Sequence, residues 1–320
     1  MKRRDENSAL RNGGPRGGGP VSPFELGNDD YYRQWREKKL SAFPRSVAEL
    51  KVTLADLGQP SVAERQRIID AIKRANMAIY VSQPPANDAD GRKLRQDLTA
   101  FLAGFGLASV EKHRSAESDG FVAIEVSQTP VKRGFIPYTS KPLSWHTDGY
   151  YNPPQAAIRA MLLHCAHAAT SGGENALLDP EIAYIRLRDA NPKWVEALMR
   201  PDAMTIPVSI EEDGSERPVS TGPVFAVDAS DGSLLMRYTA RGRNIHWRDD
   251  EDTRAATAFL ERVLKDEQEP LVLRAQLEPG EGLICNNVLH TRTAFEDTGT
   301  PRRLILRARF ATRIATHEPE

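Results

Sequence analysis

Hydrophobic residues recur at helical spacing over much of the first third of the chain. The pattern begins at Asp29, returns after residue 61 and covers roughly 92–103. Ser46 and Ser61 each stand three residues before a glutamate, which is the spacing of a capping box, so each serine is predicted to begin a helix. This part of the chain is therefore expected to be mainly helical.

After Gly120 the spacing of apolar residues shortens to that of strands, with turn residues between short runs. We predict strands at 121–126, 134–138, 157–165, 224–227, 234–238, 271–277, 282–285 and 303–310, after an earlier one at 78–81. Helical spacing returns over 180–187, 192–199 and 252–264. Many short strands with helices inserted early and mid-chain predict a β-rich α+β fold, a double-sheet jelly roll with helical decoration.

The domain organisation follows from shifts in composition. Residues 1–25 are rich in glycine and proline and poor in large apolar side chains, so we expect a flexible tail. Its basic residues lack interleaved aromatic side chains, which argues against a nucleic-acid-binding arm. Residues 26–320 are expected to form one domain, in which 26–110 are mainly helical and 111–315 form the jelly-roll core with a helical insert.

The overall composition is that of an ordinary soluble protein, with 40% hydrophobic and 27% charged residues and a net charge of −1. Neither nucleic acid nor a membrane surface is therefore expected as a partner, although a homo-oligomer is possible. Cys165 and Cys285 are too few for a disulfide framework and are expected to be small buried groups. No secretion signal or membrane-length apolar run is present, so we expect a cytoplasmic protein.

Candidate chemistry begins near the midpoint, where residues 144–151 read SWHTDGYY. In an extended backbone His146 and Asp148 point to the same side, and with one distant histidine they would form a 2-His-1-carboxylate site for non-haem iron. Taken alone, the pair is weak evidence and is better explained by exposed polar residues in a loop. A second stretch at 279–295 supplies the distant residue, His290, within the run NNVLHTRTAF.

Thirteen residues beyond His290 stands Arg303, at the start of a predicted strand. In that strand Arg303, Arg307 and Arg309 share one face, while the apolar residues that alternate with them form a packing face. A row of guanidiniums inside a protein requires anions to meet it, and arginine binds a carboxylate through two parallel hydrogen bonds.

These residues resemble the taurine dioxygenase (TauD-like) family of Fe(II)/2-oxoglutarate-dependent oxygenases, with some similarity to its butyrobetaine-hydroxylase branch. The similarity rests on His-Thr-Asp, Gly-Gly-Glu-Asn, Asn-Asn-Val-Leu-His-Thr-Arg-Thr-Ala-Phe and Arg-Arg-Leu-Ile-Leu-Arg, which occur in the order of the family between about residues 135 and 311. The resemblance implies a cupin-like double-stranded β-helix as the core of a catalytic domain.

The resemblance also implies roles for individual residues. It makes His146, Asp148 and His290 the iron ligands, and Arg303 the partner of the distal carboxylate of 2-oxoglutarate. Asn175 stands where related enzymes place another polar group on 2-oxoglutarate. Arg307 stands where the taurine enzyme holds the sulfonate of its substrate, so a small-molecule substrate with an anionic group is implied.

The residues that flank the pair are less specific. Trp145, Tyr150 and Tyr151 could form an aromatic wall against a substrate or could equally belong to the core. His164 and His167 are interpreted as hydrogen-bonded core or surface histidines in place of metal ligands, and Arg309 as structural.

The implied activity is that of a 2-oxoglutarate-dependent dioxygenase using Fe(II), 2-oxoglutarate and O2. Such an enzyme would hydroxylate a small organic acid or amino-acid-like substrate through a ferryl intermediate, with release of succinate and CO2. Desaturation or carbon–heteroatom cleavage with the same cofactors remains open. A non-catalytic cupin-like metal-binding module or a zinc hydrolase is also conceivable, but either would leave Arg303 without a role.

Overall fold

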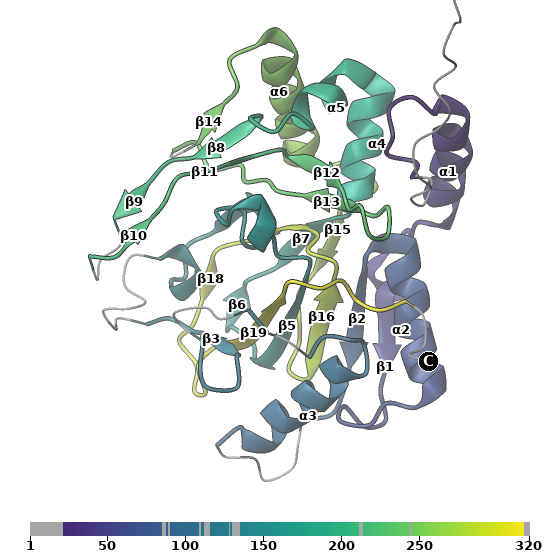
Figure 1. Cartoon of the computed structure of the whole chain (residues 1–320). Helices are drawn as coiled ribbons and strands as arrows, with labels where there is room; N and C mark the ends of the chain where they lie inside the picture. The colour runs from purple at the N-terminus through teal and green to yellow at the C-terminus, as the bar shows by residue number, and fades with distance from the viewer. Residues whose placement is uncertain are drawn as a thin grey trace, which may run out of the picture.

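The computed structural model describes residues 22–84, 88, 90–108, 110–111, 116–127, 129, 135–210, 214–243 and 245–316. The α-helices are α1 (Asp29–Ala42), α2 (Val62–Ala75), α3 (Arg92–Ala103), α4 (Pro180–Ala190), α5 (Pro192–Leu198) and α6 (Glu251–Lys265). Short 3-10 helices are η1 (Val47–Leu50), η2 (Ile136–Tyr138) and η3 (Pro154–Ala156). Figure 1 shows α4, α5 and α6 gathered above the strands, with α1 and α2 along one side.

One layer of the core is a six-stranded sheet. In spatial order its strands are β1 (Lys51–Thr53), β2 (Met77–Val81), β16 (Glu281–Cys285), β5 (Ala160–His167), β19 (Leu304–Phe310) and β3 (Val122–Ile124). Strands β1 and β2 pair in parallel, and the remaining neighbours are antiparallel. The segment predicted as mainly helical thus also extends this sheet by two strands.

A four-stranded sheet supplies the second layer and carries both histidines of interest. Its order is β15 (Leu273–Ala275), β7 (Asn175–Leu178), β17 (Leu289–Arg292) and β4 (Leu143–His146). Antiparallel pairing of β17 with β4 sets His290 opposite His146. Residues 144 apart in the sequence therefore meet through backbone register alone.

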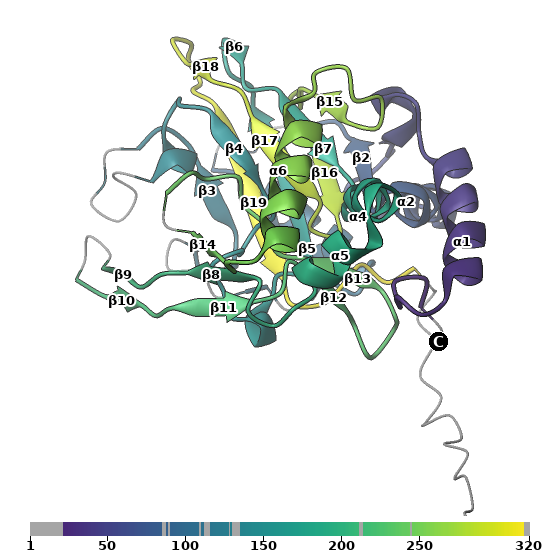
Figure 2. The ribbon, with the colours of Figure 1, turned by 90° about the horizontal axis from the view of Figure 1, so that it is seen from above.

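Further strands extend from this core. A three-stranded sheet has the order β11 (Ser220–Gly222), β8 (Met204–Ile206) and β14 (His246–Trp247). Three pairs of strands are β9 (Ser209–Ile210) with β10 (Glu216–Arg217), β12 (Phe225–Val227) with β13 (Leu234–Met236), and β6 (Ser171–Gly172) with β18 (Phe295–Glu296). We call the described residues of strands β8 to β11 the arm. It projects away from α1 in both views (Figures 1 and 2).

The predicted jelly roll is confirmed, and most predicted elements lie where the hydrophobic pattern put them. The apolar face of β19 is also as predicted, because Leu306, Ala308 and Phe310 are buried in the main core. His164 is buried and its Nδ1 lies 2.9 Å from the Tyr80 hydroxyl, so its interpretation as a hydrogen-bonded core histidine is confirmed.

The helix predicted to begin at Ser46 with a capping box forms only as one 3-10 turn, η1, without the capping box. The Ser46 side chain makes no capping hydrogen bond, and the Glu49 carboxylate accepts from the Arg45 backbone N–H at 2.9 Å. The chain forms only η1 there and then enters β1. At Ser61 both halves of the capping box are present, and α2 begins as predicted.

Two further boundaries differ from the prediction. The strand predicted at 134–138 is instead the 3-10 helix η2, in a segment whose residue 134 lies outside the described residues. Residues 1–21 of the expected tail lie outside the described residues. Phe24, within the same predicted tail, is buried against Trp35 and Tyr184. The packed fold therefore begins before residue 25.

None of the helices described is both long and apolar enough to cross a membrane.

Candidate active site

The two histidine rings lie side by side in the four-stranded sheet, with their centroids 4.3 Å apart. Each ring has one nitrogen occupied by its own strand. His146 Nδ1 lies 2.8 Å from the Ser144 carbonyl, and His290 Nδ1 lies 2.9 Å from the Val288 carbonyl. When each Nδ1 donates to its carbonyl, each Nε2 is left with a lone pair facing the site, which is the form in which histidine binds metals.

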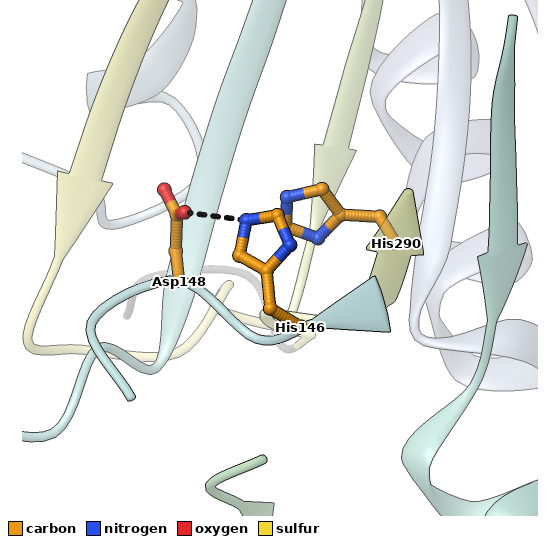
Figure 3. Close-up of side chains that lie close together, drawn as sticks. All are labelled: His146, Asp148 and His290. Carbon is orange, nitrogen blue, oxygen red and sulfur yellow. Dashed lines mark ion pairs between the residues drawn. The ribbon is translucent and has the colours of Figure 1, made fainter. Parts of the chain in front are cut away.

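Asp148 stands just beyond the end of β4, in a turn and not in the strand itself. Its carboxylate faces His146, with Oδ1 3.6 Å from Nε2 (Figure 3). Gly149 makes the turn possible, since its φ is +66° and a Cβ there would lie 2.4 Å from a side-chain carbon of Ile158. The shared orientation of His146 and Asp148 thus comes from a strand followed by a tight turn.

Asn287 fixes the backbone of this turn from the other stretch of sequence. Its amide accepts from the Asp148 N–H at 2.8 Å and donates to the Asp148 carbonyl at 3.0 Å and the Ile158 carbonyl at 2.7 Å. Asn287 itself has φ of +49°, a left-handed conformation that asparagine tolerates better than most residues. The sequence prediction did not single out Asn287, although it lies within a quoted run.

His146, Asp148 and His290, which we call the triad, offer ligand atoms that all lie within 4.8 Å of one another. Burial, together with the neighbouring His146, lowers the pKa of His290 to about 4, so its imidazole is neutral at pH 7. Burial alone would raise the pKa of the Asp148 carboxyl, but Arg307, with Nη1 3.3 Å from Oδ2, holds that pKa well below its ordinary value.

The triad fits a divalent cation. Asp148 Oδ2 is buried and accepts no hydrogen bond from the described residues, although it is paired with Arg307. A buried carboxylate oxygen that accepts no hydrogen bond, close to two neutral imidazole nitrogens, is a donor set that a metal ion completes. Two nitrogens and one oxygen on one side also leave the opposite side open for other ligands.

Arg303 and Asn175 line a second, smaller pocket, which we call the anchor pocket, together with Gly172, Gly173 and Cys165. The Arg303 guanidinium is buried over the Phe295 ring at 4.8 Å, and no described carboxylate forms an ion pair with it. Asn175 Nδ2 donates to the carbonyl of Thr291, the residue after His290, at 2.7 Å. Asn175 therefore links the anchor pocket to the strand that carries His290.

The triad opens into a cavity of about 620 Å³ between the core and the arm. Tyr150, Tyr151 and Arg307 line this cavity, so the structure brings these predicted residues to the site. Tyr150 lies edge-on to the His146 ring, and Tyr151 accepts from Arg309 Nη1 at 2.9 Å. Arg309 also pairs with Glu111, which agrees with its interpretation as structural.

The structure does not bring Trp145 to the cavity. Alternation along β4 turns its side chain away from that of His146, and its Nε1 donates to the Leu264 carbonyl in α6 at 2.8 Å. Sequence reasoning also missed the cavity residues Arg241 and Arg243, which follow β13. Their only local signal is their type, because the sequence does not show that this loop folds back onto β4.

A jelly roll with two histidines and a carboxylate close together defines a class, the jelly-roll proteins with a non-haem metal site. Within it, this chain belongs to the taurine catabolism dioxygenase TauD, TfdA family, whose model matches residues 41–309. The family predicted from the sequence is thereby confirmed.

Sequence relatives are named for one activity. A uridine-5'-phosphate dioxygenase from an Amycolatopsis species is 33% identical over 177 residues, which cover 52% of this chain and 60% of the relative. A protein of the same name from a Streptomyces species is 31% identical over 184 residues, covering 53% and 62%. The chain thus matches less than two thirds of the length of either relative.

Solved structures share the fold at lower identity. An asparagine oxygenase in complex with Fe(II), 2S,3S-3-hydroxyasparagine and succinate superposes with a TM-score of 0.55 at 16% identity, covering 82% of this chain and 93% of that one. The non-heme iron oxygenase OrfP in complex with Fe, succinate and (3S)-hydroxy-L-Arg gives 0.55 at 18% identity, covering 78% of each. At these identities the likeness establishes the fold.

Proposed function

We propose that this protein is an Fe(II)- and 2-oxoglutarate-dependent dioxygenase that oxidises a small anionic molecule. The observation that carries the proposal is the triad, with its ligand atoms within 4.8 Å of one another, next to the anchor pocket. Asn175 of that pocket bonds to the residue after His290, and its buried Arg303 forms no ion pair with a carboxylate among the described residues. When bound, Fe(II) with 2-oxoglutarate and O2 supplies the oxidation of an unactivated C–H bond, coupled to release of succinate and CO2.

Each residue then has a separate task. His146, His290 and Asp148 hold the metal, and the strand carbonyls that accept from the two Nδ1 atoms keep the rings oriented. Arg303 binds the distal carboxylate of 2-oxoglutarate, where Phe295 and the surrounding burial exclude competing water. Asn175 stands beside it as a further polar contact.

The substrate side is the cavity next to Tyr150 and Tyr151. Arg307 lines it while pairing with Asp148, so its proposed contact with the substrate and its contact with the ligand carboxylate share one guanidinium. The names of the sequence relatives support a nucleotide, and those of the solved structures support amino acids. Succinate release, measured with uridine 5'-phosphate, amino acids, sulfonates and other carboxylates as candidate substrates, identifies which class of compound is oxidised.

Replacing Arg303 tests the proposed co-substrate site. Arg303→Ala removes a two-pronged, charge-assisted contact in a buried pocket, so we expect the Kd for 2-oxoglutarate to rise about 100-fold. Calorimetry on anaerobic Fe(II)-loaded protein measures it without requiring the substrate. Arg302→Ala is the matched control, because Arg302 is the adjacent exposed arginine. Equal Kd values in the two variants would remove Arg303 from the co-substrate site.

A further inference from the structure

The cavity beside the triad is positively charged. Five arginines and three carboxylates line it. Its volume of about 620 Å³ is in the range of about 300–1,000 Å³ that holds drug-sized ligands, so it has room for more than a small amino acid. The question is which arginines remain available to a substrate.

The two arginines of β19 are already matched by acidic or hydroxyl groups. Arg307 lies 3.3 Å from the Asp148 carboxylate. Arg309 is paired with Glu111 and donates to the Tyr151 hydroxyl. Both side chains are buried, and their charge balances carboxylates of the site itself. These two arginines alone would therefore neutralise only part of the charge of a doubly charged substrate group.

The loop after β13 offers guanidiniums of a different kind. Arg241 and Arg243 line the cavity with their side chains exposed, and within the described part of the chain neither is paired with a carboxylate. The loop begins at the triad, since Thr239 forms a backbone bridge with His146. These two arginines therefore leave a net charge of about +2 at one edge of the cavity.

Tyr150 links this edge to the metal-binding residues. Its ring centroid lies 6.3 Å from that of His146, and its hydroxyl accepts from Arg241 Nη1 at 2.9 Å. The hydrogen bond holds Arg241 at the cavity, and the other N–H groups of its guanidinium donate to no residue in the part of the chain that the structure describes. An anion on Arg241 would thus be separated from His146 by about the length of one tyrosine side chain, leaving space for the carbon that reacts.

Two guanidiniums two residues apart suit a phosphate better than a carboxylate. A phosphomonoester carries close to two negative charges at pH 7 and offers three oxygens, enough for two arginines at once. A single carboxylate is already satisfied by one. The sequence relatives are named for uridine 5'-phosphate, and the charged group of that compound is a phosphomonoester.

We propose that Arg241 and Arg243 form the phosphate subsite of a nucleoside-monophosphate substrate, with Tyr150 positioning Arg241. This inference rests on the proposed function, because it assigns the substrate of the same site. It differs from the sequence prediction, which placed the anionic group of the substrate on Arg307.

Binding of uridine 5'-phosphate and of uridine to the anaerobic Fe(II)·2-oxoglutarate protein, measured by calorimetry, tests the proposal. We expect the nucleotide to bind at least tenfold more tightly than the nucleoside. Arg241→Gln and Arg243→Gln should each weaken nucleotide binding about 10- to 100-fold and leave uridine binding unchanged. Arg274→Gln is the control, because Arg274 is an exposed arginine on β15 that does not line the cavity.

Tyr150→Phe separates positioning from direct contact. It keeps the ring and removes the hydroxyl that holds Arg241, so nucleotide affinity should fall by a smaller factor of about 3–5, with uridine again unchanged. Because Arg241 and Arg243 are exposed, their variants should keep the wild-type Tm.

Two results would overturn the proposal. The first is that the wild-type protein binds uridine 5'-phosphate no more tightly than uridine. The second is that Arg241→Gln and Arg243→Gln both bind the nucleotide as tightly as Arg274→Gln does. Failure of the proposed function is distinguishable, because the Fe(II) protein would then give no visible absorption with 2-oxoglutarate, whatever the nucleotide does.

Discussion

At the scale of single residues, the site depends on side chains that hold the triad without belonging to it. Asn287 is the clearest case, because its amide binds both the N–H and the carbonyl of Asp148. These hydrogen bonds determine where the carboxylate stands relative to the two imidazoles. Outer partners of metal ligands contribute to affinity in this way although they never touch the ion.

Asn287→Ala should therefore weaken Fe(II) binding by about 10- to 100-fold, measured by anaerobic metal titration. The fold should also lose stability, since three buried hydrogen bonds disappear. Asn286→Ala is a matched control. Its side chain bonds to Asn76 and to the Ile314 N–H, so it should destabilise the fold and leave Fe(II) affinity unchanged. Similar Fe(II) affinities in the two variants would contradict the assignment.

Residue chemistry was also the most predictable part of the site. His146, Asp148, His290 and Arg303 could be chosen from the sequence because their types and spacing are demanding. Asn287 and Arg241 could not, since their roles arise from contacts with residues 139 and 91 positions away. Trp145 shows that being next to a site residue in the sequence does not place a side chain in the site, because successive residues of a strand point to opposite faces.

At the scale of elements, two buried arginines attach the walls of the cavity to the core. Arg292, on β17 two residues after His290, donates to the carbonyls of Pro137, Thr139 and Lys141. Arg237 donates to the carbonyls of Met204 and Ser220 at the base of the arm. Burial lowers the pKa of each guanidinium to about 10, so both remain charged at neutral pH.

Replacing these arginines should loosen one wall at a time. Arg292→Met frees the carbonyls around η2, and we expect amide hydrogen exchange over 136–142 to accelerate about tenfold while the arm is unaffected. Arg237→Met should produce the reverse pattern, with faster exchange in the arm alone. Hydrogen exchange read by mass spectrometry resolves the two segments. Uniform acceleration in either variant would show that the walls are not held separately.

Elements with a strong local sequence pattern were predictable. Elements whose start depends on which of two hydrogen-bond partners a side chain takes were not. The capping box at Ser61 forms because Glu64 reaches back to it, whereas Glu49 is drawn to the Arg45 N–H and leaves Ser46 without its partner. Strand alternation identified β5, β16 and β19. It missed β7 and also β17, which reads LHTR and has a single apolar residue.

At the scale of the whole molecule, the jelly roll places chemistry from distant segments together. The strand pairs β4–β17 and β7–β17 bring His146, His290 and Asn175 into one sheet, and β19 carries Arg307 and Arg309 in the other sheet. The sequence indicated a double-sheet fold but not which strands pair, because pairing depends on contacts between segments far apart in the chain. That pairing is what makes the site.

The central claim is that the triad binds Fe(II) and that 2-oxoglutarate chelates it beside Arg303. Anaerobic titration of the Fe(II)-loaded protein with 2-oxoglutarate tests it most directly. We predict a weak visible charge-transfer band that requires Fe(II) and saturates at one 2-oxoglutarate per chain. Stoichiometric Fe(II) in the protein with no such band at saturating 2-oxoglutarate would contradict the account.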